Sequence, residues 1–162
     1  MIWEKLQESL IFKDMKAETD SDVFEIMGGE LTRQGYAKDS YVQALIDREK
    51  DYPTALDIDG IGVAIPHTDI SHINKSVIAV GTMAKPVKFH EMGGDEDSLI
   101  DVSVIFILCI SNPGGHIDEL QRIINIIQDK SVLENIRDAE SSDAILEIIK
   151  NKELSLDAEA AV

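Results

Sequence analysis

Residues 60–69 read Gly-Ile-Gly-Val-Ala-Ile-Pro-His-Thr-Asp. The two glycines allow the backbone to turn or to approach a neighbouring segment closely. Small and β-branched residues at 63–65 predict a short buried strand, and Pro66 ends it because proline has no N–H for a sheet ladder. His67 is therefore the first side chain beyond a strand end, in a loop position where functional residues are common. The alternative is that His67 is an ordinary surface histidine.

Two helices are predicted upstream of this stretch. The first covers Thr19 to Gln34, where apolar residues recur at helical spacing, with Thr19 or the following aspartate as cap and Gly35 as stop. The second is capped by Asp39 and ends near residues 48–50, shortly before a tyrosine-proline pair. The short link between them predicts an antiparallel pair. Residues 53–59 then form a connection to the glycine-containing stretch.

Further strands are predicted on both sides of residues 60–69. Residues 9–12 predict a short strand near the start, and residues 76–84 and 86–90 predict two more after the glycine-containing stretch. An acidic, glycine-rich loop at 91–98 follows. Residues 99–110 are the most apolar part of the chain, and their length and composition predict a central strand buried on both faces.

Three helices are predicted after the longest apolar strand. Residues 112–115, Asn-Pro-Gly-Gly, break the chain, and a helix starts at about His116. Residues 131–134, Ser-Val-Leu-Glu, match a capping box for the second helix. Ser141 or Ser142 caps the third.

The end of the chain has a different composition. From Asn151 onward it is rich in aspartate, glutamate and alanine, and we expect it to fray. Helices before, between and after a few strands, with no repeat or linker, predict one α/β domain over residues 1–150 and an acidic tail over 151–162.

Composition limits the classes of partner. The chain has 15 Lys+Arg against 31 Asp+Glu, a formal net charge of −16, which argues against a nucleic acid or an anionic membrane as partner. It favours basic protein partners, or serves solubility alone. No apolar run approaches the roughly 20 residues of a membrane span, and the first residues do not have the pattern of a signal peptide. We therefore expect a cytoplasmic protein without direct membrane insertion.

Cysteine and histidine content argues against the common metal sites. The single cysteine, Cys109, excludes an internal disulfide and a multi-cysteine zinc site, and its apolar context predicts a small buried side chain. His67 and His72 could share a metal with Asp69, but no further ligand follows at a recognisable spacing. No phosphate-binding glycine loop of the Walker type occurs. The sequence therefore predicts no metal and no cofactor.

A histidine nucleophile remains as the candidate chemistry. Histidine can accept a phosphoryl group because its ordinary pKa, near ~6.5, leaves one ring nitrogen unprotonated at neutral pH. The other ring nitrogen then needs an acceptor, and the phosphoryl oxygens need donors. His67 fits the first requirement. His116 and the first amides of its helix can meet the second, or His116 is a plain residue of a helix N-terminus.

Several motifs together resemble a known family. Tyr41, Arg48-Glu49, Pro53-Thr54 and residues 60–67, in this order and spacing, are similar to the enzyme IIA domain of the bacterial sugar phosphotransferase system, in its fructose/mannitol class. The helix start His-Ile-Asp-Glu-Leu at 116–120 also resembles that family. The resemblance covers about residues 6–150. It implies a single α/β domain whose central mixed sheet of about five strands has helices on both faces.

The resemblance also implies a phosphorelay without metal or cofactor. His67 would accept a phosphoryl group from the phosphohistidine of the carrier protein HPr and pass it to an enzyme IIB partner while a sugar is taken up. His116 would be a donor that stabilises the phosphoryl group, and Arg48 would support the site. Glu49 would support that arginine, and Thr54 would orient the site loop.

Two alternatives stay open. The same fold can serve a regulatory phosphoprotein that signals to a transporter, a kinase or a transcription factor. The acidic loop at 91–97 and the Asn112-Pro113 turn resemble the galactitol branch, which need not keep a histidine at the position of His116. In either case we expect a rim of apolar residues around His67 with few acids, since a carboxylate there would repel the incoming group.

Overall fold

Five strands form one mixed sheet in the computed structural model, which describes residues 1–112 and 115–160 without the side chains of Gly115 and His116. In spatial order the strands are β1 (Leu6–Met15), β4 (Val77–His90), β5 (Leu99–Cys109), β3 (Ile61–Ala64) and β2 (Ala55–Ile58). The β1–β4 and β5–β3 pairs are parallel, and the β4–β5 and β3–β2 pairs are antiparallel. The predicted fold class, a mixed sheet of about five strands in an α/β domain, is confirmed.

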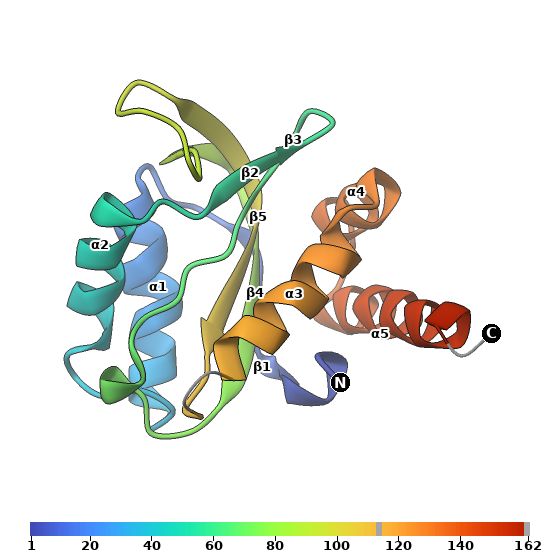
Figure 1. Ribbon diagram of the computed structural model, residues 1–162, viewed down its shortest axis with the longest axis horizontal. Coiled ribbons are helices and arrows are strands. Elements are labelled where there is room, and N and C mark those ends of the chain that lie inside the picture. Colours follow the sequence, from blue (N-terminus) through green and yellow to red (C-terminus); the bar gives the residue numbers. More distant parts are fainter. Residues whose placement is uncertain (113–114, 161–162) are drawn as a thin grey trace.

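Helices cover both faces of this sheet (Figure 1). One face packs against α1 (Asp20–Arg33) and α2 (Tyr41–Asp51). The other packs against α3 (Gly115–Ile127), α4 (Lys130–Arg137) and α5 (Ser142–Ala160). Within the described part of the chain, no helix combines the length and the apolarity that a membrane span requires.

The central strand β5 serves both cores. Its odd-numbered residues from Ile105 to Cys109 join the core under α1 and α2, and its even-numbered residues from Val104 to Leu108 join the core under α3–α5. Because successive side chains of a strand point to opposite faces, both sets must be apolar. This explains why the strand is a continuous apolar run and confirms the prediction of a strand buried on both faces.

The segment predicted as a connection, residues 53–59, contains the short strand β2. It pairs with β3 through a two-residue loop in which Asp59 and Gly60 have φ of 51° and 99°. Two consecutive positive φ values are typical of a type I′ turn, which matches the twist of the paired strands. Asp57 steadies this turn because its Oδ1 accepts the backbone N–H of Gly60 at 2.7 Å. The prediction of a plain connection was therefore wrong.

Two other strand predictions need correction. A 3₁₀ turn, η1 (Trp3–Lys5), precedes β1, which begins at Leu6 and is longer than the predicted 9–12. The two strands predicted at 76–84 and 86–90 are one strand, β4. Its pairing with β5 shifts register between Thr82 and Val87, and this irregularity accommodates Pro86, which has no N–H to pair.

Some of the predicted helix caps are observed and others are not. Thr19 caps α1 in a capping box with Asp22, as predicted in outline. The cap of α2 is Ser40 instead of Asp39, and the cap of α4 is Asp129, which accepts the N–H of Ser131. Helix α4 already begins at Lys130, so the capping box predicted at 131–134 lies inside its first turn.

The last helix begins at a predicted cap and extends into the segment that was predicted as a tail. Ser141 caps α5, because its Oγ accepts the N–H of Ala144 at 3.1 Å. The helix then continues through Asn151 to Ala160, so the described part of the segment that we expected as an acidic tail is helical.

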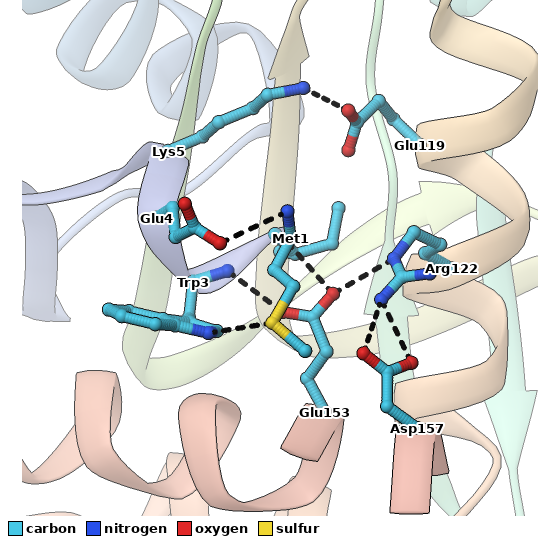
Figure 2. Close-up of polar contacts among 9 residues, drawn as sticks. Met1, Trp3, Glu4, Lys5, Glu119, Arg122, Glu153 and Asp157 are labelled. Atoms are coloured by element: carbon cyan, nitrogen blue, oxygen red, sulfur yellow. Dashed lines mark hydrogen bonds and ion pairs between the residues drawn. The ribbon is translucent and has the colours of Figure 1, made fainter. Parts of the chain in front are cut away.

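The buried residue Glu153 explains the length of α5. Its carboxylate is 1% exposed and accepts the backbone N–H groups of Ile2 and Trp3 at 2.8 and 3.0 Å (Figure 2). The Nε of Arg122 in α3 donates to the same carboxylate at 2.9 Å, and the guanidinium also reaches Asp157. These contacts join the start of the chain to its last helix.

Candidate functional site

His67 lies just beyond β3, attached to the central strand. The N–H of Leu108 in β5 donates to the carbonyl oxygen of Pro66 at 3.0 Å, and His67 forms an isolated parallel bridge with Leu108. The backbone after the strand end is therefore still fixed to the central strand of the sheet. This places the half-buried His67 ring on a rigid support, as the sequence indicated.

The ring of His67 is held at one nitrogen by the chain that precedes it. Nδ1 lies 3.1 Å from the carbonyl oxygen of Ile65. A carbonyl can only accept, so this contact requires a proton on Nδ1. In that tautomer Nε2 carries the lone pair of the ring.

The peptide of Ile65 is held on its other side by Thr54. The N–H of Ile65 donates to Oγ1 of Thr54 at 3.2 Å. This contact agrees with the expectation that Thr54 orients the site loop. Thr54 precedes β2, so the β2–β3 hairpin brings it beside the residue that contacts His67.

Glu49 in turn holds Thr54. Its carboxylate accepts the backbone N–H of Thr54 at 2.8 Å and the hydroxyl at 3.0–3.1 Å. Burial raises the pKa of Glu49 to about 7 from its ordinary value near 4.5, against the opposing effect of the Thr54 hydrogen bonds. We expected Glu49 to support Arg48. The hydrogen bonds of its carboxylate go to Thr54 instead, and the charge of Arg48 interacts with it by lowering its pKa.

A hollow of about 430 Å³ lies beside His67. Its lining consists of Asp51, Tyr52, Pro53, Thr54, His67, Met92, Gly93 and Gly94. Tyr52 is 64% exposed and Met92 is 37% exposed, so large apolar surface borders the histidine. Among the described lining residues Asp51 is the single acid. The expected apolar rim is present, and Asp51 is the exception to it.

Arg48 lies in a depression next to that hollow. It lines this depression, which shares Asp51 and Tyr52 with the hollow of His67. Its guanidinium carbon stands 5.1 Å from the centre of the Tyr52 ring, a cation–π contact. Its Nε is buried and has no hydrogen-bond partner among the described residues. Arg48 thus has donor capacity close to the site without lining the hollow of His67 itself.

The other histidines have separate positions. The backbone of His116 is in the first turn of α3, but its side chain lies outside the described residues, so its predicted donor role stays a prediction. His72 is half-buried, and its Nδ1 contacts Oγ of Ser40 at 2.8 Å. His90 is exposed at the end of β4.

The described residues offer no arrangement for a metal. Residues 1–112 and 115–160 contain no cluster of three or more histidine, cysteine, aspartate or glutamate side chains that could hold a metal ion. Cys109 is fully buried, and burial raises the pKa of its thiol to about 12. This confirms the prediction of a small buried side chain.

Comparisons with known proteins match one family over nearly the whole chain. Residues 4–152 match the family model described as "Phosphoenolpyruvate-dependent sugar phosphotransferase system, EIIA 2". The chain is 30% identical over 151 residues to the mannitol-specific EIICBA component of Escherichia coli K12, covering 91% of this chain and 22% of that protein. It is 28% identical over 116 residues to the galactitol-specific EIIA component of the same strain, covering 72% of this chain and 76% of the relative. It thus spans about a fifth of the mannitol relative.

A solved structure shows the same fold. The IIA chain in the complex of enzyme IIA-mannitol and phosphorylated enzyme IIB-mannitol from Escherichia coli superposes with a TM-score of 0.76 at 28% identity. The match covers 91% of this chain and 98% of that chain.

Proposed function

Because the chain belongs to the EIIA 2 family of the phosphoenolpyruvate-dependent sugar phosphotransferase system, whose members are phosphotransferase components, we propose that it is a cytoplasmic phosphoryl carrier. His67 accepts a phosphoryl group from phosphorylated HPr and passes it to an enzyme IIB partner during uptake of a sugar or hexitol. The observation that carries this proposal is the contact between His67 Nδ1 and the Ile65 carbonyl, because it leaves the lone pair of the ring on Nε2.

The transfer is a displacement at phosphorus between two histidines. The lone pair of His67 Nε2 attacks the phosphorus, and a new N–P bond forms as the N–P bond of the donor histidine breaks. The electron pair of the broken bond returns to the ring nitrogen of the donor. The His67 ring gains positive charge in this step, and the Ile65 carbonyl oxygen at Nδ1 stabilises that charge. Transfer to enzyme IIB reverses these steps on a new acceptor.

Donors for the phosphoryl oxygens come from neighbouring elements. We assign this role to His116 in the first turn of α3, and a supporting role to Arg48, on the family resemblance. The unpartnered Nε of Arg48 among the described residues is consistent with that support. A cation near the site offsets part of the negative charge of the transferred group.

The exposed apolar residues beside His67 suit a protein partner. Tyr52 and Met92 border the hollow, and Ile117 in α3 is also a large exposed side chain. Aromatic residues and methionine are enriched where proteins associate. The solved Escherichia coli complex has a IIA chain bound to a phosphorylated IIB chain, and by analogy we propose a IIB partner here.

The experiment is a reconstituted relay with labelled phosphoenolpyruvate, enzyme I and HPr. We expect acid-labile label on the wild-type chain, none on His67→Ala, and full label on His90→Ala, which removes an exposed histidine as a control. Each variant is first checked for folding by circular dichroism. Label that persists in His67→Ala would show that another residue is phosphorylated, with His116 as the next candidate.

Addition of enzyme IIB proteins separates transport from regulation. Label that moves on to a mannitol-type or galactitol-type IIB protein supports the sugar relay and indicates the substrate class. Label that stays on His67 with every IIB protein offered would favour the regulatory phosphoprotein instead.

A further inference from the structure

The peptide group of Ile65 is fixed by a hydrogen bond at each end. Its N–H donates to Oγ1 of Thr54 at 3.2 Å, and its carbonyl oxygen lies 3.1 Å from Nδ1 of His67. Rotation of this peptide plane would break both contacts together. Whatever holds Thr54 therefore also affects the proton on the His67 ring.

Thr54 is held in a single orientation by Glu49. The hydroxyl of Thr54 donates its one proton to the Glu49 carboxylate, so a lone pair of Oγ1 is left to face the N–H of Ile65. The backbone N–H of Thr54 donates to the same carboxylate at 2.8 Å. Glu49 and Thr54 are 4% and 3% exposed, so water does not compete for these bonds.

We propose that Glu49 and Thr54 are positioning residues for His67. Through the Ile65 peptide they keep the proton of the ring on Nδ1 and the lone pair on Nε2. Each residue acts through the next member of the series Glu49, Thr54, Ile65 and His67. This inference rests on the proposed function, in which His67 is the nucleophile.

The series is built across separate elements. Glu49 is in the last turn of α2, Thr54 precedes β2, and Ile65 follows β3. Hydrogen-bonded chains in a water-poor interior strengthen one another, so loss of one member weakens the rest. An imidazole without a fixed acceptor at Nδ1 divides its proton between both nitrogens, which lowers the fraction of the reactive tautomer.

The first test measures the tautomer itself. Nitrogen-15 NMR of the unphosphorylated chain distinguishes a proton on Nδ1 of His67 from one on Nε2. We expect the Nδ1–H tautomer in the wild type and in Thr54→Ser, which keeps a hydroxyl, and a mixture in Thr54→Val, which keeps only the shape. A wild-type ring protonated on Nε2 alone would overturn the proposal, and this arm needs no variant to fold.

The second test measures the phosphorylation rate by phosphorylated HPr. We expect kcat for Thr54→Val to fall about tenfold, with KM changed by less than about twofold, since a misoriented nucleophile affects the transition state more than partner binding. Thr54→Ser should stay within about threefold of the wild type in kcat. A Ser variant as slow as the Val variant, with both rings in the wild-type tautomer, would show that Thr54 has only a packing role.

The two proposals can fail separately. If the wild type accepts no label, the phosphorelay is wrong, and the NMR arm still decides whether Glu49 and Thr54 orient the ring. If the wild type accepts label and Thr54→Val retains both its tautomer and its rate, the relay stands and the positioning role is wrong. Glu49→Gln provides the matched change at the other member: its amide oxygen can still accept from Thr54, so we expect the wild-type tautomer.

Discussion

Gly62 in β3 lies against the backbone of Asp101 in β5, so closely that a Cβ atom on Gly62 would stand 2.0 Å from the Asp101 carbonyl oxygen. The β3–β5 pairing shifts register between Gly62 and Val63, at the same place. A side chain at position 62 would push β3 away from the central strand. This approach is what brings the chain after β3 to Leu108, and so sets the backbone of His67.

Gly62→Ala should destabilise the protein strongly. The clash is with backbone, which cannot move aside as a flexible side chain can, and we expect a loss of about 3 kcal/mol or more in the free energy of unfolding. Urea denaturation followed by circular dichroism measures it. Gly29→Ala is the control, because a Cβ there would meet no described atom within 4 Å apart from its chain neighbours and its own helix backbone, and a helical alanine should add about 0.5–1 kcal/mol. Equal effects of the two changes would contradict this explanation.

The Glu153 contacts should contribute strongly to the stability of the folded protein. Glu153→Ala leaves two backbone N–H groups and the Nε of Arg122 without their acceptor (Figure 2), and we expect a loss of about 2–4 kcal/mol in the free energy of unfolding. Glu159→Ala, at an exposed position of the same helix, should change it by less than about 0.5 kcal/mol. Hydrogen exchange should accelerate at Ile2 and Trp3 in the first variant only. Unchanged exchange there would show that these amides do not depend on Glu153.

Elements that carry their signal in their own residues could be predicted from the sequence. The apolar run at 99–110 predicted β5 because a strand with helices on both faces has no polar side to show. Thr19 and Gly35 marked the ends of α1 for local reasons, a side-chain acceptor for orphan amides and a positive φ.

Elements that depend on a distant partner could not be predicted in the same way. Strand β2 has only four residues, and it exists because the turn at Asp59-Gly60 folds it onto β3. Pro86 suggested a break, yet a register shift in the β4–β5 pairing accommodates it. The acidic composition after Asn151 suggested a frayed end, whereas Glu153 is buried against amides 150 residues away.

The candidate site also combines local signals with contacts between distant segments. His67 could be located from the strand and proline before it, because both are local signals. The series from Glu49 through Thr54 to Ile65 joins three segments, and only the folded chain shows it. Thr54, directly before β2, was the available sequence signal, since a threonine buried at a strand start needs partners for its hydroxyl.

The thiol of Cys109 should be unreactive in the folded protein. Burial raises its pKa to about 12, so very little thiolate exists at neutral pH, and the side chain has no exposed surface. A thiol reagent such as dithionitrobenzoate should modify Cys109 only as fast as the protein unfolds, and at once in urea. Ser9→Cys, on an exposed position of β1, should add one rapidly reacting thiol. Rapid modification of native Cys109 would show that the core over β5 opens readily.

Asp51 should slow the phosphorylation of His67. It lines the hollow beside the histidine, where its negative charge repels the incoming phosphoryl group. We expect Asp51→Asn to raise kcat/KM with phosphorylated HPr by about two- to fivefold at low salt, and by less at high salt because ions screen exposed charges. Glu140→Gln removes the same charge between α4 and α5 and should change the rate little. A slower Asp51→Asn would mean that this carboxylate assists the transfer or the partner.

The raised pKa of Glu49 should appear as a pH dependence of stability. Burial raises the pKa to about 7 in the folded protein, whereas the unfolded chain titrates near 4.5, so the folded state retains a proton that the unfolded state has released. The stability from this group is therefore fully present below pH 4.5 and is lost as the pH rises through 7. Asp20 raises this pKa further, while Arg48 and the Thr54 bonds lower it.

Glu49→Gln isolates that effect, because its amide resembles the protonated carboxyl and does not titrate. Relative to this variant, the wild type should lose about 2 kcal/mol in the free energy of unfolding between pH 5.5 and pH 8. Urea denaturation of both proteins across this range measures the difference, and it stays above the isoelectric point near 4.4, where solubility falls. All other titrating groups are common to the two proteins, so their contributions cancel. A difference that does not change with pH would show that Glu49 is ionised in the folded protein throughout, with the Thr54 hydrogen bonds outweighing its burial.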